Sequence, residues 1–195
     1  MVQMTEQEKK LSDMSLEELW KLFPIQLTAH NEIWSVYYEE MKKSVRQILS
    51  DCSIVRISHI GSTAINGIWA KPIVDILVEI DKNEDIKKVE ALLQSVGFIP
   101  MSAESDRISL NLGYTEKGFA EKVYHLHIRC KGDNDELYFR DYLNEFPEIS
   151  KLYEQLKLSL WKEYEHNRDG YTNAKTKFVN KYTEEAKAKY LNRYN

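Results

Sequence analysis

Three segments of the chain alternate between apolar and polar residues, and this alternation constrains the fold more than any other feature. The segments are residues 73–80, 107–114 and 122–130. Successive side chains of a β-strand point to opposite faces of the sheet, so each segment is predicted to have one apolar face and one polar face. The sequence therefore predicts a sheet that packs helices on its apolar face and leaves its polar face open.

The polar face of this predicted sheet gathers three residues with functional chemistry. Asp75 lies on it in the first segment, and His125 and His127 lie on it in the last. In the middle segment, the alternation assigns to the apolar face Ile108, Leu110, Leu112 and Tyr114. Polar strand residues often face only water, and that alternative stays open for each of the three. If the strands form one sheet, Asp75 and the two histidines converge at one site.

The other elements follow from helical periodicity and from helix start and stop signals. Ser15 and Glu18 form a capping box, which predicts a short helix that ends before Pro24. Further helices are predicted over residues 31–49, 84–97, 135–146, 147–166 and 172–191, with a first strand over 53–60 and a hairpin turn around 115–121. In the helix that begins at Pro147, the predicted apolar stripe is Ile149, Leu152, Leu156, Leu160 and Tyr164.

This order of elements predicts an α+β fold, because a hairpin is not part of a doubly wound parallel sheet. Residues 1–23 are expected to form a lead-in with a short helix, and residues 24–195 a single domain. Within that domain, the mixed sheet and its helices are expected over residues 24–132, and a helical extension over 133–195.

Composition excludes several classes of protein. The formal net charge of −4 offers no extended basic surface for nucleic acid, although it is compatible with a local phosphate site. No apolar run approaches the roughly 20 residues of a membrane span, and the polar start of the chain has no signal-peptide core. Cys52 and Cys130 have no metal-binding spacing, which favours a reduced, cytoplasmic setting. The oligomeric state has no signature in the sequence.

A Gly-Ser turn, "IGST" at residues 60–63, lies between the first strand and the strand that carries Asp75. The backbone N–H groups of such a turn and its two hydroxyl groups are suited to holding a phosphate. A Gly-Ser pair alone is a weak signal, but a Gly-Ser turn that an acidic strand follows is more specific. Gly61, Ser62 and Thr63 are therefore candidate phosphate-binding residues.

These residues resemble the signature of the nucleotidyltransferase superfamily, in which a Gly-Ser turn precedes an acidic strand. Within that superfamily, the chain is identified as a member of the GrpB family, also called UPF0157. The block "HIGSTAINGIWAKPIVDILVEI" is similar to the family's "HIGSTSVPGL-AKPIIDI-V", and "YHLHIR" and "FRDYLNEFPE" follow in the family's order. The resemblance extends over residues 25–182.

The resemblance implies a nucleotidyltransferase-like sheet packed by helices and a metal-dependent site. Asp75, His125 and His127 would bind a divalent metal, and Asp75 and His127 would be the catalytic residues. Mg²⁺ prefers oxygen ligands, whereas two imidazoles favour a transition metal, so the cofactor is expected to be Mg²⁺ or a transition metal ion. The partner would be a nucleotide or another phosphorylated small molecule.

Two basic residues outside the turn are candidates for phosphate binding. Lys71 directly precedes Pro72 at the start of the acidic strand, and its alternative role is that of a surface lysine. Arg140 could reach the mouth of the sheet or form a structural ion pair. Arg140 and Asp141 occupy adjacent positions, which do not face each other on a helix.

A second group of candidates lies in the last helical region. Arg168, Tyr171 and Lys175 are spaced three and four residues apart, which places them on one helical face. This face is suited to stacking a base on Tyr171 and to holding phosphates with Arg168 and Lys175. The alternative is an amphipathic helix with a solvated basic side.

The chain departs from the superfamily pattern at one point that matters for chemistry. Enzymes of the superfamily usually carry two acids at alternate positions of the signature strand, but Ile73 and Leu77 flank Asp75 here. Only Glu79 could supply a second carboxylate on the same face. The leading hypothesis is transfer of a nucleotidyl group from a nucleoside triphosphate to an unknown acceptor. The alternatives are a non-catalytic nucleotide-binding or CoA-related module and a metal-dependent hydrolase of a small phosphorylated compound.

Overall fold

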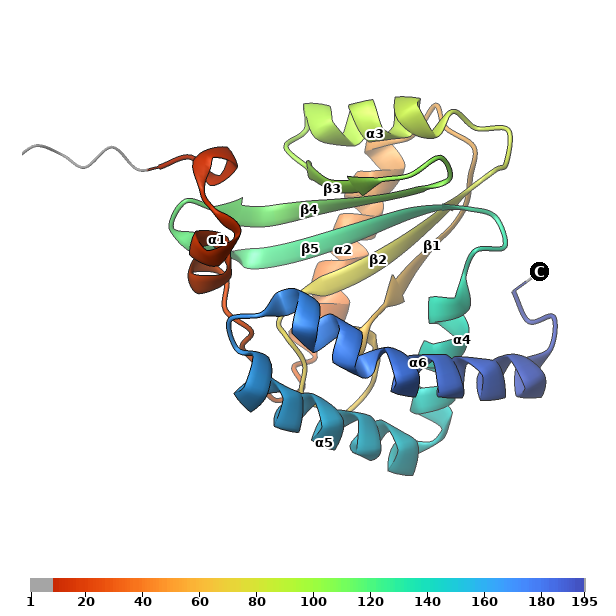
Figure 1. Ribbon diagram of the computed structural model, residues 1–195. Coiled ribbons are helices and arrows are strands. Elements are labelled where there is room, and N and C mark those ends of the chain that lie inside the picture. The colour runs from red at the N-terminus through yellow and green to blue at the C-terminus, as the bar shows by residue number, and fades with distance from the viewer. Residues whose placement is uncertain (1–8, 195) are drawn as a thin grey trace, which may run out of the picture.

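The computed structural model describes residues 9–194 and contains a mixed five-stranded sheet (Figure 1). Its strands, in the spatial order β1-β2-β5-β4-β3, are Ile54–Ile60, Val74–Ile80, Gly118–Cys130, Arg107–Thr115 and Ile99–Ala103. β2 and β5 pair in parallel, and the other neighbouring strands are antiparallel. The predicted α+β class is confirmed.

Six α-helices accompany the sheet within residues 9–194 (Figure 1). They are α1 Leu16–Leu22, α2 Ile33–Ile48, α3 Ile86–Ser95, α4 Asp135–Glu145, α5 Pro147–Tyr164 and α6 Arg168–Tyr190, with 3-10 turns η1 at Leu11–Asp13 and η2 at Ser62–Ala64. The capping box of Ser15 and Glu18 is present at α1, and Pro147 begins α5 as predicted. None of the helices in this part of the chain is long and apolar enough to cross a membrane.

The main hydrophobic core lies between the sheet and the helices α2 and α3. It contains the apolar side chains that alternation assigned to one face of the sheet, among them Val74, Ile76, Val78, Leu110, Leu126 and Ile128. Trp34, Met41 and Val45 from α2 and Val89 and Leu93 from α3 complete this layer. The predicted facing of β2 and β5 therefore agrees with the structure.

The opposite face of the sheet is less open than the alternation predicts. Helices α4, α5 and α6 lie across its β1–β2 side (Figure 1). Leu77, on the same face as Asp75, is fully buried in a cluster with Ile60 and with Leu137 of α4. The polar face is thus partly roofed by the helical extension, which leaves a cavity in place of a bare sheet surface.

The strand β3 is not among the predicted elements. It contains Pro100, all five of its residues are exposed, and it pairs only with β4, at the edge of the sheet. Proline is tolerated in edge strands because one side of such a strand needs no hydrogen-bond donor. Five residues that include a proline are too short a segment for their alternation to stand out in the sequence.

An irregularity in the pairing of β4 with β5 overturns the predicted orientation of Tyr114. The register between β4 and β5 shifts between Leu112 and Tyr114, at Gly113, whose φ is 92°. A Cβ atom at this position would lie 2.3 Å from the carbonyl oxygen of Lys122, so only glycine fits. Between the pairs Leu112–Tyr124 and Tyr114–Phe119, β5 has three residues more than β4, so the bulge lies in β5, opposite Gly113. The backbone turn at Gly113 reverses the alternation in β4, and Tyr114 lies on the same face as His125 instead of in the core.

The buried face of α5 agrees with the predicted apolar stripe at Ile149, Leu156, Leu160 and Tyr164, which pack into hydrophobic clusters, but not at Leu152. Leu152 is 47% exposed, whereas the buried residues of this helix are Ser150, Tyr153, Glu154, Lys157 and Leu160. The helix is rotated relative to the predicted stripe because its polar residues bind the segment before β2. Glu154 accepts a hydrogen bond from the backbone N–H of Trp69, and Lys157 donates one to the Trp69 carbonyl oxygen.

Candidate metal and phosphate site

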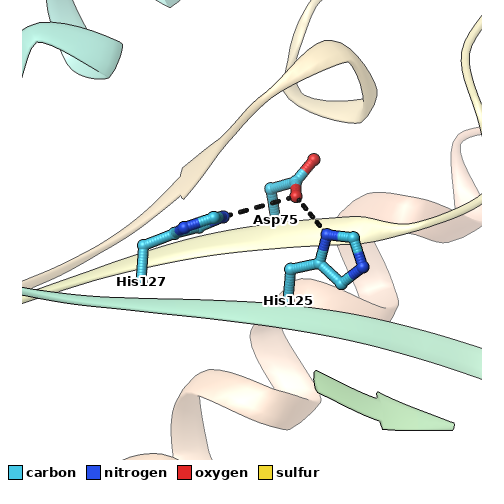
Figure 2. Close-up of side chains that lie close together, drawn as sticks. All are labelled: Asp75, His125 and His127. Atoms are coloured by element: carbon cyan, nitrogen blue, oxygen red, sulfur yellow. Dashed lines mark hydrogen bonds and ion pairs between the residues drawn. The ribbon is translucent and has the colours of Figure 1, made fainter. Parts of the chain in front are cut away.

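The parallel pairing of β2 and β5 brings three side chains together. Asp75 is the register partner of His125, and Leu77 is the partner of His127, so all three functional side chains project from the same face (Figure 2). Asp75 Oδ1 lies 3.0 Å from His125 Nδ1 and 3.5 Å from His127 Nε2. One potential ligand atom from each residue lies within 4.8 Å of the others. These three side chains are the Asp-His-His cluster.

His125 is held at both ring nitrogens. Its Nε2 lies 2.8 Å from the Tyr114 hydroxyl oxygen, which accepts a hydrogen bond of 2.9 Å from Arg168 Nη2. Because Arg168 donates to Tyr114, the Tyr114 hydroxyl is free to donate to His125, whose Nδ1–H then donates to Asp75. His127 is held more loosely, with Ser109 Oγ 3.4 Å from its Nδ1.

Burial and these contacts set the protonation of the cluster. Burial by itself would raise the pKa of Asp75, but the hydrogen bonds and charges of His125 and His127 outweigh it and hold the pKa below its usual value. Burial lowers the pKa of His125, although Asp75 opposes this shift. The cluster therefore presents an ionised carboxylate beside a neutral imidazole. An ion at His125 Nδ1 would require the other tautomer, in which the proton is on Nε2 and is donated to the Tyr114 hydroxyl oxygen.

Gly61 allows the Asp75 carboxylate to rest against the backbone of the Gly-Ser turn. Its φ is 69° and its ψ is −170°, a conformation that residues with a side chain rarely adopt. A Cβ atom at Gly61 would lie 2.3 Å from Asp75 Oδ2. The glycine of "IGST" is therefore required by the position of the acid that follows it on β2.

The rest of the Gly-Ser turn divides between the site and the fold. The N–H groups of Ser62 and Thr63 are the first donors of the η2 turn, so they have no acceptor within it. Ser62 lines the cavity beside Asp75. Thr63 does not: it is buried, its hydroxyl donates to the Ile73 carbonyl oxygen over 3.1 Å, and it contacts His59 Nε2. The predicted phosphate contact of Thr63 is wrong for its side chain, because the hydroxyl is used inside the fold.

Three lysines gather at the side of the cavity near α5 and α6. Lys71 and Lys175 were predicted from the sequence, and Lys157 was not, because its position on α5 looks like that of any solvated lysine. Burial lowers the pKa of Lys71 and of Lys157 to about 7, and that of Lys175 to about 8. A buried ammonium group that has lost its water lacks a partner for its charge. A bound anion would supply that partner and raise the pKa of the lysines again, so this group of side chains is suited to binding an anion.

Tyr171 does not have the predicted role of a stacking platform. Arg168, Tyr171 and Lys175 do line the cavity together from α6, as their spacing predicts. The Tyr171 ring, however, is only 1% exposed, and it packs with Ile25 and Leu160. The ammonium nitrogens of Lys71 and Lys175 lie 5.2 and 4.2 Å from its ring centroid. Tyr171 therefore supports the two lysines through cation–π contacts.

Of the two roles considered for Arg140, a phosphate contact and a structural ion pair, its contacts match the structural one. Its Nη1 donates to the His59 carbonyl oxygen over 2.8 Å, and its Nε and Nη2 donate to Asp141 Oδ1 over 2.9 and 2.7 Å. The two side chains pair although adjacent helix positions do not face each other, because the long arginine side chain folds back onto its neighbour. The Arg140 side chain fastens α4 to β1 and does not line the cavity of the Asp-His-His cluster.

Glu79 is not a second acid of the site. It lies on the same face of β2 as Asp75, but it is fully buried. Its Oε1 accepts hydrogen bonds from Gly132 N–H and from the Asn134 amide, and its Oε2 lies 3.3 Å from Arg56 Nε. The carboxylate ties the end of β5 and the start of α4 to the sheet. Asp75 is therefore the one β2 carboxylate that reaches the cavity.

The cluster fits a divalent transition metal better than it fits Mg²⁺. One carboxylate and two imidazoles are donors that Mn²⁺, Zn²⁺ and Ni²⁺ accept, whereas Mg²⁺ prefers oxygen ligands alone. The three side chains are between 18% and 25% exposed, so an ion could enter and would keep open positions for a ligand. Of the two metals that the sequence suggests, the geometry favours the transition metal.

The cluster opens into a cavity of about 990 Å³. Its polar walls come from Ser62, Lys71, Lys157, Arg168 and Lys175. Its other walls come from α1, from the turn before it and from β3. The chain is therefore an α+β protein whose mixed sheet holds a Gly-Ser turn against an acid-bearing strand, with a helical extension over that face.

Comparison with known proteins places the chain more narrowly. The family model described as GrpB protein matches residues 24–185, and the chain belongs to the GrpB family. It is 35% identical over 158 residues to the glutamate-rich protein GrpB of Alkalihalophilus pseudofirmus, across 78% of this chain and 90% of that protein. It is 28% identical over 177 residues to the UPF0157 protein YqkA of Bacillus subtilis, across 89% of this chain and 50% of that longer protein.

Solved structures agree with this assignment. The crystal structure of the conserved protein GrpB from Enterococcus faecalis matches with a TM-score of 0.72 and 30% identity, across 85% of this chain and 99% of that chain. A weaker likeness to the Cid1 poly(U) polymerase, with a TM-score of 0.49 and 10% identity across 82% of this chain and 51% of that chain, carries no functional inference.

Proposed function

We propose that this protein binds a nucleoside triphosphate together with a divalent metal ion and transfers the nucleotidyl group to an acceptor molecule. The observation that supports the proposal best is the position of the Asp-His-His cluster, which lies in the same cavity as three desolvated lysines and the Gly-Ser turn. A metal site beside a cationic wall suits a ligand that carries several phosphate charges.

The residues of the chain have distinct parts in this reaction. Asp75 and His125 would hold the ion, and His127 would complete the ligand set or accept a proton. The N–H groups of the Gly-Ser turn and the ammonium groups of Lys71, Lys157 and Lys175 would bind the phosphates. A bound divalent ion supplies neutralisation of phosphate charge.

Proton transfer is the chemical step that the chain itself can assist. The acceptor's nucleophile forms a bond to the α-phosphorus while the bond to the bridging oxygen of the β-phosphate breaks, and pyrophosphate leaves. His127 is the candidate to take the proton of the acceptor, because it is less tightly bound than His125. The lysines would stabilise the charge of the departing pyrophosphate.

The second candidate function is binding without transfer. The position of Glu79 favours it, because Glu79 is engaged in the fold and leaves Asp75 as the one β2 carboxylate in the cavity. A site with one carboxylate does not reproduce two-metal catalysis. A module of this kind would bind a nucleotide or a CoA-related molecule and release it unchanged.

Two variants on one strand test the metal site. Asp75→Asn is expected to abolish the rise in melting temperature that Mn²⁺ or Zn²⁺ causes, because it removes the one charged ligand. Glu79→Gln is the matched control: it lowers the melting temperature of the metal-free protein but keeps the metal-induced rise. If Asp75→Asn keeps the full metal response, the Asp-His-His cluster is not the metal site.

Turnover separates the two candidate functions. Wild-type protein is incubated with Mn²⁺, each of the four ribonucleoside triphosphates and a mixture of small acceptors, and pyrophosphate is measured. Pyrophosphate release that is lost in Asp75→Asn and in His127→Gln supports transfer. Calorimetric binding of a triphosphate without pyrophosphate release supports the binding module, and the absence of both contradicts the proposal.

A further inference from the structure

The cavity changes in character from one side of the sheet to the other. Strand register places four residues in one row across β2, β5, β4 and β3: Asp75, His125, Asn111 and Ile99. Along this row the side chains pass from a carboxylate and an imidazole to an amide and then to an aliphatic group. The metal and phosphate residues therefore occupy only the β2 end of the cavity.

The β3 end of the cavity is apolar and incompletely covered. Ile99 and Met101 line it and are 40% and 58% exposed. Across from them, α1 contributes Leu16, Leu19 and Trp20. Leu16 is 56% exposed, and no residue of α1 is buried, so this helix shows its apolar side to the cavity without filling it.

The helix α1 is nevertheless fixed in place at its C-terminal end. Phe23 is 3% exposed, and its ring centroid lies 4.7 Å from that of Tyr114 and 5.0 Å from that of Phe119. Tyr114 in turn contacts His125, so α1 is attached to the same residues that orient the cluster. Residues 9–23 lie outside the segment that the GrpB family model matches.

We infer that the cavity takes a small molecule with an anionic group at the cationic end and an aliphatic or aromatic body against α1 and β3. The volume supports this, because a metal ion and a phosphate group would fill only a minor part of about 990 Å³. The inference rests on the phosphate site of the proposed function, which the anionic group of this molecule would occupy. Residues 9–23 then select this ligand by its apolar body.

Alkyl phosphates of increasing length test this inference. In calorimetric titrations with Mn²⁺, hexyl phosphate is expected to bind at least tenfold more tightly than methyl phosphate, because each fully buried methylene contributes about 0.8 kcal/mol, or roughly fourfold. Leu16→Asp and Met101→Glu are expected to reduce the advantage of hexyl phosphate to less than threefold and to leave methyl phosphate binding unchanged. Leu152→Asp, at an exposed leucine of α5 that does not line the cavity, is expected to change neither.

The outcomes distinguish this inference from the proposed function. Equal affinity for methyl and hexyl phosphate overturns the apolar subsite but leaves the phosphate site standing. Tighter binding of AMP than of hexyl phosphate would assign the apolar end to a nucleobase and also overturn the inference. If the protein binds phosphatidic acid vesicles but not hexyl phosphate, the ligand is a membrane lipid and the inferred free small molecule is wrong. If no phosphate compound binds, the proposed function is contradicted, and the inference, which depends on the same phosphate site, is contradicted too.

Discussion

At the scale of single residues, the contact between Gly61 and Asp75 shapes the site. The carboxylate occupies the space in which any larger residue at position 61 would place its Cβ atom. The Gly-Ser turn and the acidic strand are thus one structural unit. This gives a physical reason for their occurrence together, independent of any phosphate.

The first prediction compares two glycines. Gly61 and Gly67 both have a φ of 69°, but a Cβ atom at Gly67 would meet nothing within 4 Å. Gly67→Ala is expected to lower the free energy of unfolding by about 1 kcal/mol, the cost of a positive φ. Gly61→Ala is expected to lower it by about 2–4 kcal/mol, because a clash is added.

A double-mutant cycle tests whether the additional destabilisation of Gly61→Ala comes from the clash with Asp75. In an Asp75→Ala background, Gly61→Ala is expected to cost about 1 kcal/mol less than in the wild type, because the clashing carboxylate is gone. Urea denaturation measures all four proteins. An unchanged cost of Gly61→Ala in that background would place the strain in the backbone and not in the contact with Asp75.

The second prediction concerns the hydroxyl of Tyr114, which links Arg168 to His125. Tyr114→Phe is expected to weaken Mn²⁺ or Zn²⁺ binding by about 10–100-fold, because an unsupported imidazole is oriented less well for a metal. Tyr38→Phe is the matched control, since it removes a 3.0 Å hydrogen bond to the Ile57 carbonyl oxygen away from the cluster. Both variants should lose about 1 kcal/mol of stability. Equal metal affinity in the two, measured by calorimetry, would exclude Tyr114 as a positioning residue.

At the scale of elements, the bulge of β5 opposite Gly113 of β4 determines which side chains reach the cavity. Without it, Tyr114 would point into the core and His125 would lose its partner at Nε2. The bulge also sets Tyr114 against Phe23, which fixes α1. One glycine therefore couples the edge of the sheet, the N-terminal helix and the candidate metal ligand.

The third prediction tests this coupling. Gly113→Ala is expected to lower the free energy of unfolding by about 2–4 kcal/mol and to reduce metal-induced stabilisation, because the bulge cannot keep its shape. Gly132→Ala provides the comparison, since its φ of 94° is similar to the 92° of Gly113 but a Cβ atom there meets nothing within 4 Å. Thermal unfolding with and without Mn²⁺ gives both quantities. A similar loss in the two variants would mean that the bulge is not needed.

At the scale of the whole molecule, the buried lysines make stability and ligand binding depend on pH in opposite directions. Burial lowers the pKa of Lys71, Lys157 and Lys175 to about 7, 7 and 8. The unfolded chain, in which these groups have ordinary pKa values near 10.5, binds more protons between pH 7 and 9. Stability of the ligand-free protein therefore rises with pH in this range as far as these lysines determine it.

The fourth prediction follows from the lowered pKa values of these lysines. A bound anion raises the pKa of the lysines, so the stabilisation by pyrophosphate is expected to be largest near pH 6 and to decline as the pH rises through 7 and 8. Melting temperatures with and without pyrophosphate, at constant ionic strength, measure it. Lys157→Met should weaken the effect, whereas Lys151→Met, at a 55% exposed side chain on the same helix, should not. A stabilisation that is constant from pH 6 to 9 would show that these lysines do not bind the anion.

The sequence by itself determined the local features of this protein. Period-two alternation assigned Asp75, His125 and His127 to one face, because each side chain's direction in a regular strand follows from its own position. The capping box at Ser15 and the proline at position 147 located two helix starts for the same reason: their hydrogen bonds and steric limits act within one turn.

Only the tertiary structure decided which side chains complete the site. The bulge at Gly113 depends on the pairing of two strands, although an isolated glycine within an alternating segment was a signal that could have indicated it. Lys157 is a site residue because α5 is rotated by contacts with Trp69, and nothing in its local sequence separates it from a solvated lysine. Arg140 and Thr63 have the chemistry to bind phosphate, but neighbours distant in the sequence, His59 and Ile73 among them, had already engaged their polar atoms. Local periodicity fixes direction along one element, whereas burial and partner choice are set by what other elements bring into contact.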